Sequence, residues 1–276
     1  MLVRKIAFST ILSSLAVFTS TVVNAATIQV TVESLAPENG TFLTPVWTGF
    51  HDGNFDIYNL GETATPALES LAEDGDFSIL SSELLGSGSG IVDGAVFGSP
   101  VIAPGSTATA IFELDPSVPS SRYFSYASML LPSNDAFVAN GNPLAHQIFD
   151  SDGNFLGADF IIAGSEVLDA GTEVNDEAEN TTAFFGQTAA NTGTAQNGVV
   201  DTHPGFIPGG SILSSNQFAN ADFTAPDYNI ARIRVEQIDS PTATTSEPGI
   251  AVALLILGGI SCIAHGSIGK NKIRFF

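Results

Sequence analysis

The chain has 276 residues, of which 44% are apolar and 9% are aromatic, and its formal net charge is −21. This composition supplies enough apolar material for a packed core, so it excludes an intrinsically disordered chain. The negative charge repels the phosphates of nucleic acids and anionic lipid surfaces, which excludes nucleic acid as a partner and makes cations the natural ones.

Residues 1–25 predict a cleaved secretory signal peptide. Arg4 and Lys5 precede an apolar stretch that ends in the small-residue pattern Val23-Asn24-Ala25. Cleavage is expected after Ala25, and a retained N-terminal anchor is the alternative. The mature chain is therefore expected to be exported.

Residues 26–239 predict one β domain. Apolar and polar residues alternate from Thr27 to Glu33, which places Ile28, Val30 and Val32 on the core face of a strand. The same alternation predicts strands over residues 108–114, 122–131 and 230–235. In the last of these, the two arginines face away from the core.

One short helix is expected between these strands. Pro66 begins a helical pattern that ends at Glu73, with Thr65 as its N-cap and Gly75 as its stop. The remainder is divided by 27 Gly and 14 Pro residues, which favours many short strands and surface loops such as residues 188–198. The predicted fold class is all-β, an antiparallel β-sandwich with one or two short helices.

Residues 240–248 predict a polar linker, and residues 249–276 predict a transmembrane segment with a basic tail. The strictly apolar part is shorter than the roughly 20 residues that span a bilayer comfortably. The only cysteine, Cys262, lies in this segment, so the exported domain has no disulfide of its own. Ser246-Glu247-Pro248, the apolar run and the terminal basic residues resemble the PEP-CTERM sorting signal of Gram-negative bacteria.

The PEP-CTERM resemblance implies recognition by an exosortase and a location at the cell surface, in the outer envelope or in the extracellular matrix. Whether the tail is removed stays open, and a plain tail anchor is the alternative. In either case the membrane is a partner through the C-terminal tail.

Several familiar catalytic motifs are absent. The Gly-Ser run at residues 86–90 lacks the Lys and the spacing of a phosphate-binding loop, so we predict a flexible turn. No histidine pair has the spacing of a zinc hydrolase. Residues 150–154 have calcium-loop character but not EF-hand spacing, and flanking apolar residues favour a hairpin turn there.

Carboxylates at predicted strand ends are the candidate site. Glu113 lies on a predicted strand, Asp135 follows another, and Asp169 and Glu173 bracket the segment Asp-Ala-Gly-Thr-Glu. Oxygen ligands gathered in an acidic, cysteine-free domain suit Ca²⁺, which takes six to eight of them. Solvated loop charges are the alternative for each carboxylate taken alone.

Residues 27–237 resemble the spondin N-terminal domain known from F-spondin and mindin. The resemblance lies in the strand with Glu113, in Pro132-Ser133-Asn134-Asp135, in residues 169–173, and in residues 47–54 and 64–75. It implies a β-sandwich with a divalent-cation site, usually calcium, on Glu113, Asp135 and Asp169, with Glu173 as a fourth ligand. This chain lacks the cysteines and thrombospondin repeats of the animal proteins, and Leu168 and Glu173 depart from their pattern.

Three functions remain as hypotheses. The first is a non-enzymatic surface or matrix module that binds Ca²⁺ and associates with an extracellular polysaccharide or a surface protein, in adhesion or biofilm. The second is a polysaccharide-active hydrolase with paired carboxylates such as Asp135 and Asp169. The third is a structural coat protein without a ligand.

Overall fold

The computed structural model describes residues 25–239. The predicted signal peptide, the linker with its sorting motif and the transmembrane tail lie outside the described residues. Within residues 25–239, no helix is both long and apolar enough to cross a bilayer.

Two antiparallel sheets form most of the described chain. The first contains, in the order β5-β1-β11-β8, the strands β1 (Ala26–Ser34), β5 (Thr107–Leu114), β8 (Ala158–Ala163) and β11 (Asn229–Ile238). The second contains β2 (Phe42–Leu43), β3 (Val46–His51), β4 (Gly90–Val96), β6 (Tyr123–Leu131), β7 (Ala136–Ala139), β9 (Leu168–Asp169) and β10 (Asp201–Thr202). Its order is β10-β9-β7-β6-β3-β4, and β2 pairs with β6.

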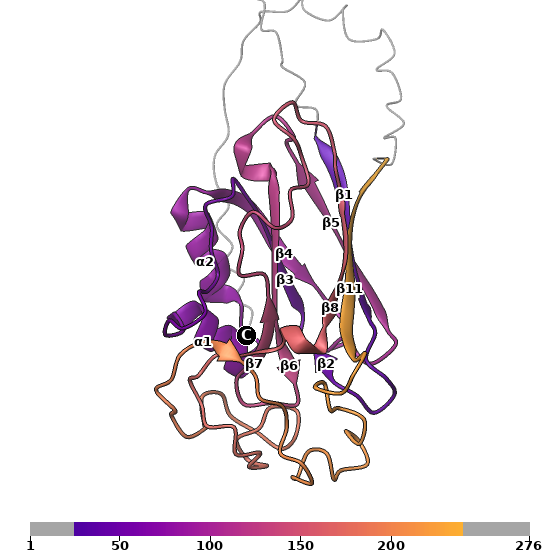
Figure 1. Cartoon of the computed structure of the whole chain (residues 1–276). Coiled ribbons are helices and arrows are strands. Elements are labelled where there is room, and N and C mark those ends of the chain that lie inside the picture. The colour runs from indigo at the N-terminus through magenta and orange to yellow at the C-terminus, as the bar shows by residue number, and fades with distance from the viewer. Residues whose placement is uncertain (1–24, 240–276) are drawn as a thin grey trace, which may run out of the picture. The chain divides into compact units, whose positions relative to one another are not determined.

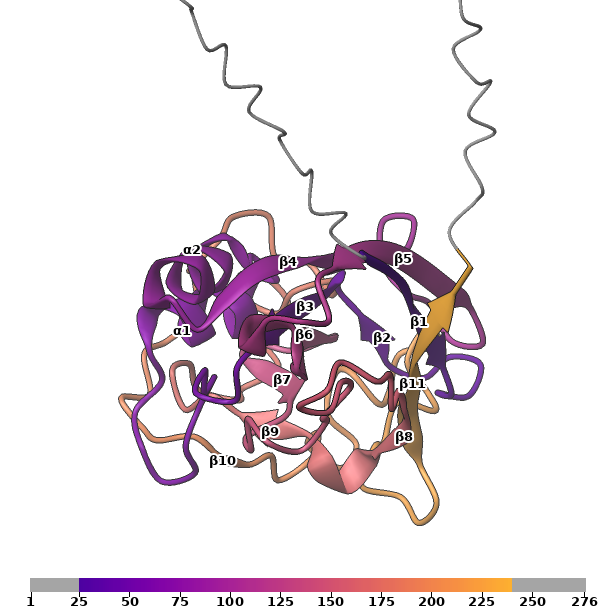
Figure 2. The ribbon, with the colours of Figure 1, turned by 90° about the horizontal axis from the view of Figure 1, so that it is seen from above.

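Helices cover one face of the second sheet. They are α1 (Pro66–Asp74) and α2 (Ser78–Ser87), and two single 3₁₀ turns, η1 (Pro119–Ser121) and η2 (Gly164–Glu166), connect strands. Figure 1 shows the two sheets face to face with the helices outside the second one, and Figure 2 shows the same layers from above. This architecture confirms a mostly β, antiparallel fold with two packed sheets and two short helices.

The main core lies between the two sheets. Ile28, Val30 and Val32 are fully buried, and Ala231, Ile233 and Val235 on the neighbouring β11 are buried beside them. The arginines of β11 face outward, where Arg232 pairs with Asp159. One face of β1 and β11 carries apolar residues packed against the second sheet, which confirms the predicted alternation, and the opposite face carries polar residues, of which Thr27 and Thr31 are also buried.

β6 departs from the predicted alternation. Every residue from Phe124 to Leu131 is buried. One face of β6 packs toward the first sheet, and the other lies under α1 within a second apolar cluster that includes Ala127, Leu68 and Leu71. The strand itself was predicted correctly, but the one-sided burial was wrong, because the helical layer covers its second face.

α1 follows the predicted capping. Thr65 is the N-cap, and its hydroxyl accepts a hydrogen bond from the backbone N–H of Leu68 at 3.2 Å. Gly75 ends the helix in the left-handed region at φ 67°. Ala67, Leu68 and Leu71 face the second sheet, so these caps hold the helix that carries Glu73.

Replacing Thr65 with Ala should destabilise the domain by about 1 kcal/mol, because the first turn of α1 loses its side-chain acceptor. Chemical denaturation measures the change. Thr63→Ala is the matched control, since Thr63 is exposed and precedes the helix. Equal stabilities for the two variants would contradict a capping role for Thr65.

The Gly-Ser run and the acidic turn are both local connections. α2 ends at Ser87, Gly88 takes a left-handed conformation, and β4 begins at Gly90, so the run joins a helix to a strand. A bridge between Phe149 and Phe155 closes residues 150–154, which confirms the predicted hairpin turn. The second helix itself was not predicted.

Candidate cation site

Strand pairing brings Asp135 and Asp169 together. β6 ends at Leu131, and a short turn leads into β7, whose Ala136 pairs with Asp169 of β9. The hydroxyl of Ser133 fixes the turn by donating to the carbonyl of Leu130 at 2.5 Å and accepting from the N–H of Ala136 at 3.2 Å. Asp135 immediately precedes β7, so the two aspartates come from adjacent strands.

The segment after Asp169 folds over the carboxylate of Asp135. Oδ2 of Asp135 accepts hydrogen bonds from the N–H of Thr172 at 2.9 Å, the hydroxyl of Thr172 at 3.1 Å and the N–H of Glu173 at 3.0 Å. Gly171 permits this turn with φ 69°, and a Cβ there would meet the backbone of Val199. The Asp-Ala-Gly-Thr-Glu segment thus has a conformational role that the sequence pattern alone did not reveal.

Asp169 is held by a chain of neutral groups. Its Oδ1 accepts from the N–H of Gly171 at 2.6 Å, and its Oδ2 accepts from Nδ2 of Asn175 at 2.5 Å. Oδ1 of Asn175 lies 3.2 Å from Nε2 of His203. Because the N–H of Gly205 donates to Nδ1 of His203 at 3.0 Å, Nε2 of the neutral ring carries the proton and donates to Asn175.

Two glutamates complete an acidic cluster. Glu173 is 3% exposed, and its Oε1 accepts from the N–H of Gly193 at 2.7 Å. Glu73 on α1 is also 3% exposed. Thr172 and Glu173 both affect the pKa of Glu73, so the helix presents this carboxylate to the 172–173 segment.

Burial and mutual repulsion disturb the ionisation of the cluster. Burial raises the pKa of Glu73 to about 7, and the charge of Glu173 raises it further. Burial, followed by the charge of Asp169, raises the pKa of Asp135 to about 6. Burial also raises the pKa of Glu173. These shifts show that the negative charge of the cluster is poorly compensated.

Two carboxylate oxygens of the cluster have no hydrogen-bond partner. They are Oδ1 of Asp135, a residue with 0% exposure, and Oε2 of Glu173. The amide of Asn134 lowers the pKa of Glu173. Neither Nδ2 of Asn134 nor Oε2 of Glu173 has a hydrogen-bond partner, however. Orphaned anionic oxygens are costly in a protein interior, so they indicate a place where a cation would be stabilising.

The side chains of the acidic cluster do not lie as close together as the ligands of a bound metal ion would. Among residues 25–239, no three His, Cys, Asp or Glu side chains converge closely enough to hold a metal. The donor set nevertheless suits a hard cation, since it consists of carboxylate oxygens with a hydroxyl and an amide beside them. Asp135, Asp169, Glu173 and Glu73 are the groups that would hold it.

No family model and no curated protein matches this chain. The spondin resemblance therefore rests on the motifs in the sequence. The acidic cluster, by its geometry, is the structural basis for a candidate cation site.

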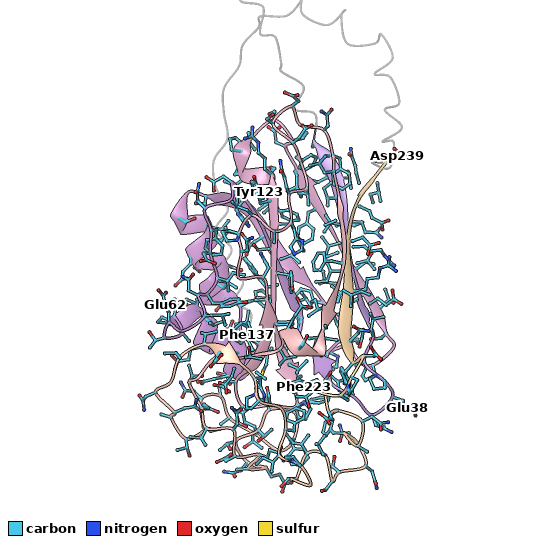
Figure 3. All side chains as sticks on the ribbon, viewed as in Figure 1. Glu38, Glu62, Tyr123, Phe137, Phe223 and Asp239 are labelled. Atoms are coloured by element: carbon cyan, nitrogen blue, oxygen red, sulfur yellow. The ribbon has the colours of Figure 1, made fainter. Side chains whose placement is uncertain are left out.

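Glu113 lies elsewhere. It is exposed on β5, where its Oε1 accepts from the hydroxyl of Thr27 at 2.8 Å. Thr27 also pairs with Ile238, next to Asp239 at the upper end of the domain in Figure 3, whereas Phe137 marks the lower end. β1 runs about 23 Å from Thr27 toward the lower end. The structure brings Asp135, Asp169 and Glu173 together but does not bring Glu113 to them.

Sequence reasoning missed Glu73, Asn175 and His203. Glu73 falls outside the i, i+3, i+4 spacing that joins the buried residues Leu68, Leu71 and Ala72, so no helical period signalled its burial. His203 and Asn175 lie in irregular segments. No sequence period predicts the side-chain direction of such residues.

Proposed function

We propose that this chain is an exported, non-enzymatic surface or matrix module that binds Ca²⁺. The ion would be held by Asp135, Asp169 and Glu173, with Glu73 as an additional ligand. Through the ordered loops, the module would associate with an extracellular polysaccharide or a surface protein. The observation that carries this proposal is the pair of buried carboxylate oxygens without partners inside a four-carboxylate cluster.

No basic group offsets this cluster. The described residues contain three arginines and no lysine, and Arg232 and Arg234 pair with acids on the outer face of β11. Arg122 precedes β6, at the opposite end of that strand from Asp135. A bound divalent cation would supply the missing positive charge, and ordering of residues 169–175 would accompany binding.

Calcium is favoured over other divalent ions by the ligand chemistry. All candidate ligands are oxygen donors, which disfavours zinc and copper. The cluster draws on α1, the turn before β7 and the loop after β9, and such a dispersed set tolerates the irregular coordination of Ca²⁺ better than the octahedron required by Mg²⁺.

The surface location and the family relation belong to the same proposal. A signal peptide at residues 1–25, a PEP-CTERM-like tail and the spondin-like motifs support an exported module at the cell surface. The 0% exposure of Asp135 disfavours the hydrolase alternative, because a catalytic carboxylate has to touch its substrate.

Calcium titration of the chelator-treated, purified chain tests this function. We expect Ca²⁺ to raise the thermal midpoint, with a stabilisation of about 2.7 kcal/mol at a free concentration of 100 times the dissociation constant. Matched ionic strength from NaCl separates binding from charge screening. Glu173→Gln should weaken binding at least about tenfold, since one lost ligand interaction is worth about 1.4 kcal/mol or more.

Glu113→Gln is the matched control, because Glu113 lies on the outer face of the other sheet. Its calcium affinity should equal that of the wild type. Identical melting of the wild-type chain with and without Ca²⁺ would refute the proposed site.

A further inference from the structure

A cavity next to His203 is a second candidate binding site. It has a volume of about 540 Å³ and is lined by Gly164 and Ser165 of η2, by Thr202 and His203, and by residues 223–229 before β11. Phe223, labelled near the lower end of β11 in Figure 3, is one of the lining residues. The volume of the cavity is typical of pockets that hold small molecules.

The cavity walls are fixed by hydrogen bonds. The N–H of Gly164 donates to the carbonyl of Tyr228 at 2.8 Å, and the Tyr228 hydroxyl accepts from the N–H of Thr41 at 2.9 Å. A Cβ at Gly164 would clash with the carbonyl oxygen of Phe223, so the close approach of η2 to the 223–229 segment needs glycine. A preformed cavity binds a ligand without a large ordering cost.

The lining combines hydroxyl and carboxylate groups with small apolar surfaces. Ser165, Thr202 and Asp227 are exposed and line the cavity. Ala163, Ala225 and Pro226 form the apolar part. Hydroxyl groups beside small apolar patches match a sugar, which alternates hydroxyls with C–H faces.

Charge restricts the kind of sugar. The cavity contains one carboxylate, Asp227, and no Lys or Arg. It therefore has no group to neutralise a uronate, sulfate or phosphate, and the surrounding negative field repels these anions. We propose that this cavity binds an uncharged sugar unit of an extracellular polysaccharide. This inference rests on the proposed function for the class of partner, while the cavity stands on its own geometry.

The cavity and the cation cluster share one wall. His203 lines the cavity, and its ring connects through Asn175 to Asp169. Sugar binding is therefore measured both with excess Ca²⁺ and with chelator.

Ligand-observed NMR titration of the full chain tests the inference. The uncharged probes are maltose, cellobiose, lactose and N-acetylglucosamine, and the charged probe is glucuronate. We expect at least one uncharged sugar to bind and glucuronate not to bind. Thr202→Val should weaken that sugar about 2- to 10-fold through loss of one hydroxyl contact, and Ser165→Trp should abolish binding by filling the cavity.

Matched controls separate the cavity from general effects. Ser151→Trp on the exposed 150–154 turn and Thr109→Val on the outer face of β5 should bind sugar like the wild type. No binding of any uncharged probe, equal binding by Ser165→Trp and Ser151→Trp, or stronger binding of a charged probe would each overturn the inference.

Calcium titration of the same proteins separates this inference from the proposed function. Ser165→Trp should keep wild-type calcium affinity, since Ser165 is not among the carboxylate ligands. Calcium binding without sugar binding removes only the cavity proposal. Sugar binding without calcium binding removes the cation site and leaves the cavity.

Discussion

Asp135→Asn should make the calcium-free protein more stable at pH 8 and abolish its stabilisation by Ca²⁺. Asparagine keeps an oxygen to accept the hydrogen bonds from Thr172 and Glu173, while it removes the buried charge. Burial and Asp169 raise the pKa of Asp135 to about 6, so ionisation at pH 8 costs the folded state free energy. The expected gain is about 1–2 kcal/mol, because weaker hydrogen bonds to the neutral amide offset part of the relief.

Urea denaturation of wild type and variant, each with chelator and with saturating Ca²⁺, measures both effects. The informative result is a variant that is more stable than the wild type in chelator but less stable than the wild type in Ca²⁺. Replacing a residue that only supports packing would lower the stability in both conditions. Glu113→Gln should change neither quantity. A less stable calcium-free Asp135→Asn variant with an undiminished response to Ca²⁺ would refute the role of Asp135 as a ligand.

Glu73→Gln should change how the stability of the calcium-free protein depends on pH. Burial, followed by nearby acidic groups, raises the pKa of Glu73 to about 7 from an ordinary 4.5. The folded state therefore binds more protons than the unfolded state between these values, and its stability falls as pH rises from about 4.5 to 7. Glutamine removes this loss, so the variant should be more stable by about 1–3 kcal/mol above pH 7.

Three histidines change the pH dependence of the stability in the opposite direction. Burial lowers the pKa of His51, His146 and His203 to about 4 from 6.5. Their neutral forms stabilise the folded state above pH 6.5, and this contribution is lost as pH falls toward 4. Wild-type stability should consequently rise with pH between about 4 and 6.5, because the three histidine shifts together exceed the opposing shifts of Glu73 and Asp135.

Denaturation midpoints at several pH values, measured in chelator, test this expectation. Glu73→Gln should gain more stability with rising pH than the wild type does, whereas Glu83→Gln on the exposed face of α2 should follow the wild type. Parallel profiles for all three proteins would show that Glu73 does not ionise within this range. Ca²⁺ should reduce the difference between Glu73→Gln and the wild type at pH 8, since the ion compensates the carboxylate.

Local patterns predicted many of the elements. The alternation in β1 and β11 and the capping residues of α1 are encoded within a few consecutive residues, so they could be derived without the tertiary fold. The strand β3 and the helix α2 were not predicted. β3 is buried along its whole length, and α2 is apolar on several sides, so neither has the one-sided pattern on which such predictions depend.

Part of the acidic cluster could likewise be predicted from the sequence, and part could not. The sequence by itself determined that Asp169 and Glu173 lie four residues apart in one segment. It also determined the charge, the lack of a disulfide within residues 26–239 and the outward arginines of β11. Each of these follows from composition or from the period of a strand.

Only the tertiary structure decided which carboxylates meet. Pairing of β7 with β9 joins Asp135 to Asp169, the packing of α1 against the second sheet adds Glu73, and the register of β5 on β1 places Glu113 at the other end. These contacts join residues far apart in the chain, and no local period specifies them. The physical reason is that strand order and helix docking are set by burial of the whole core, which the spacing of a few side chains does not fix.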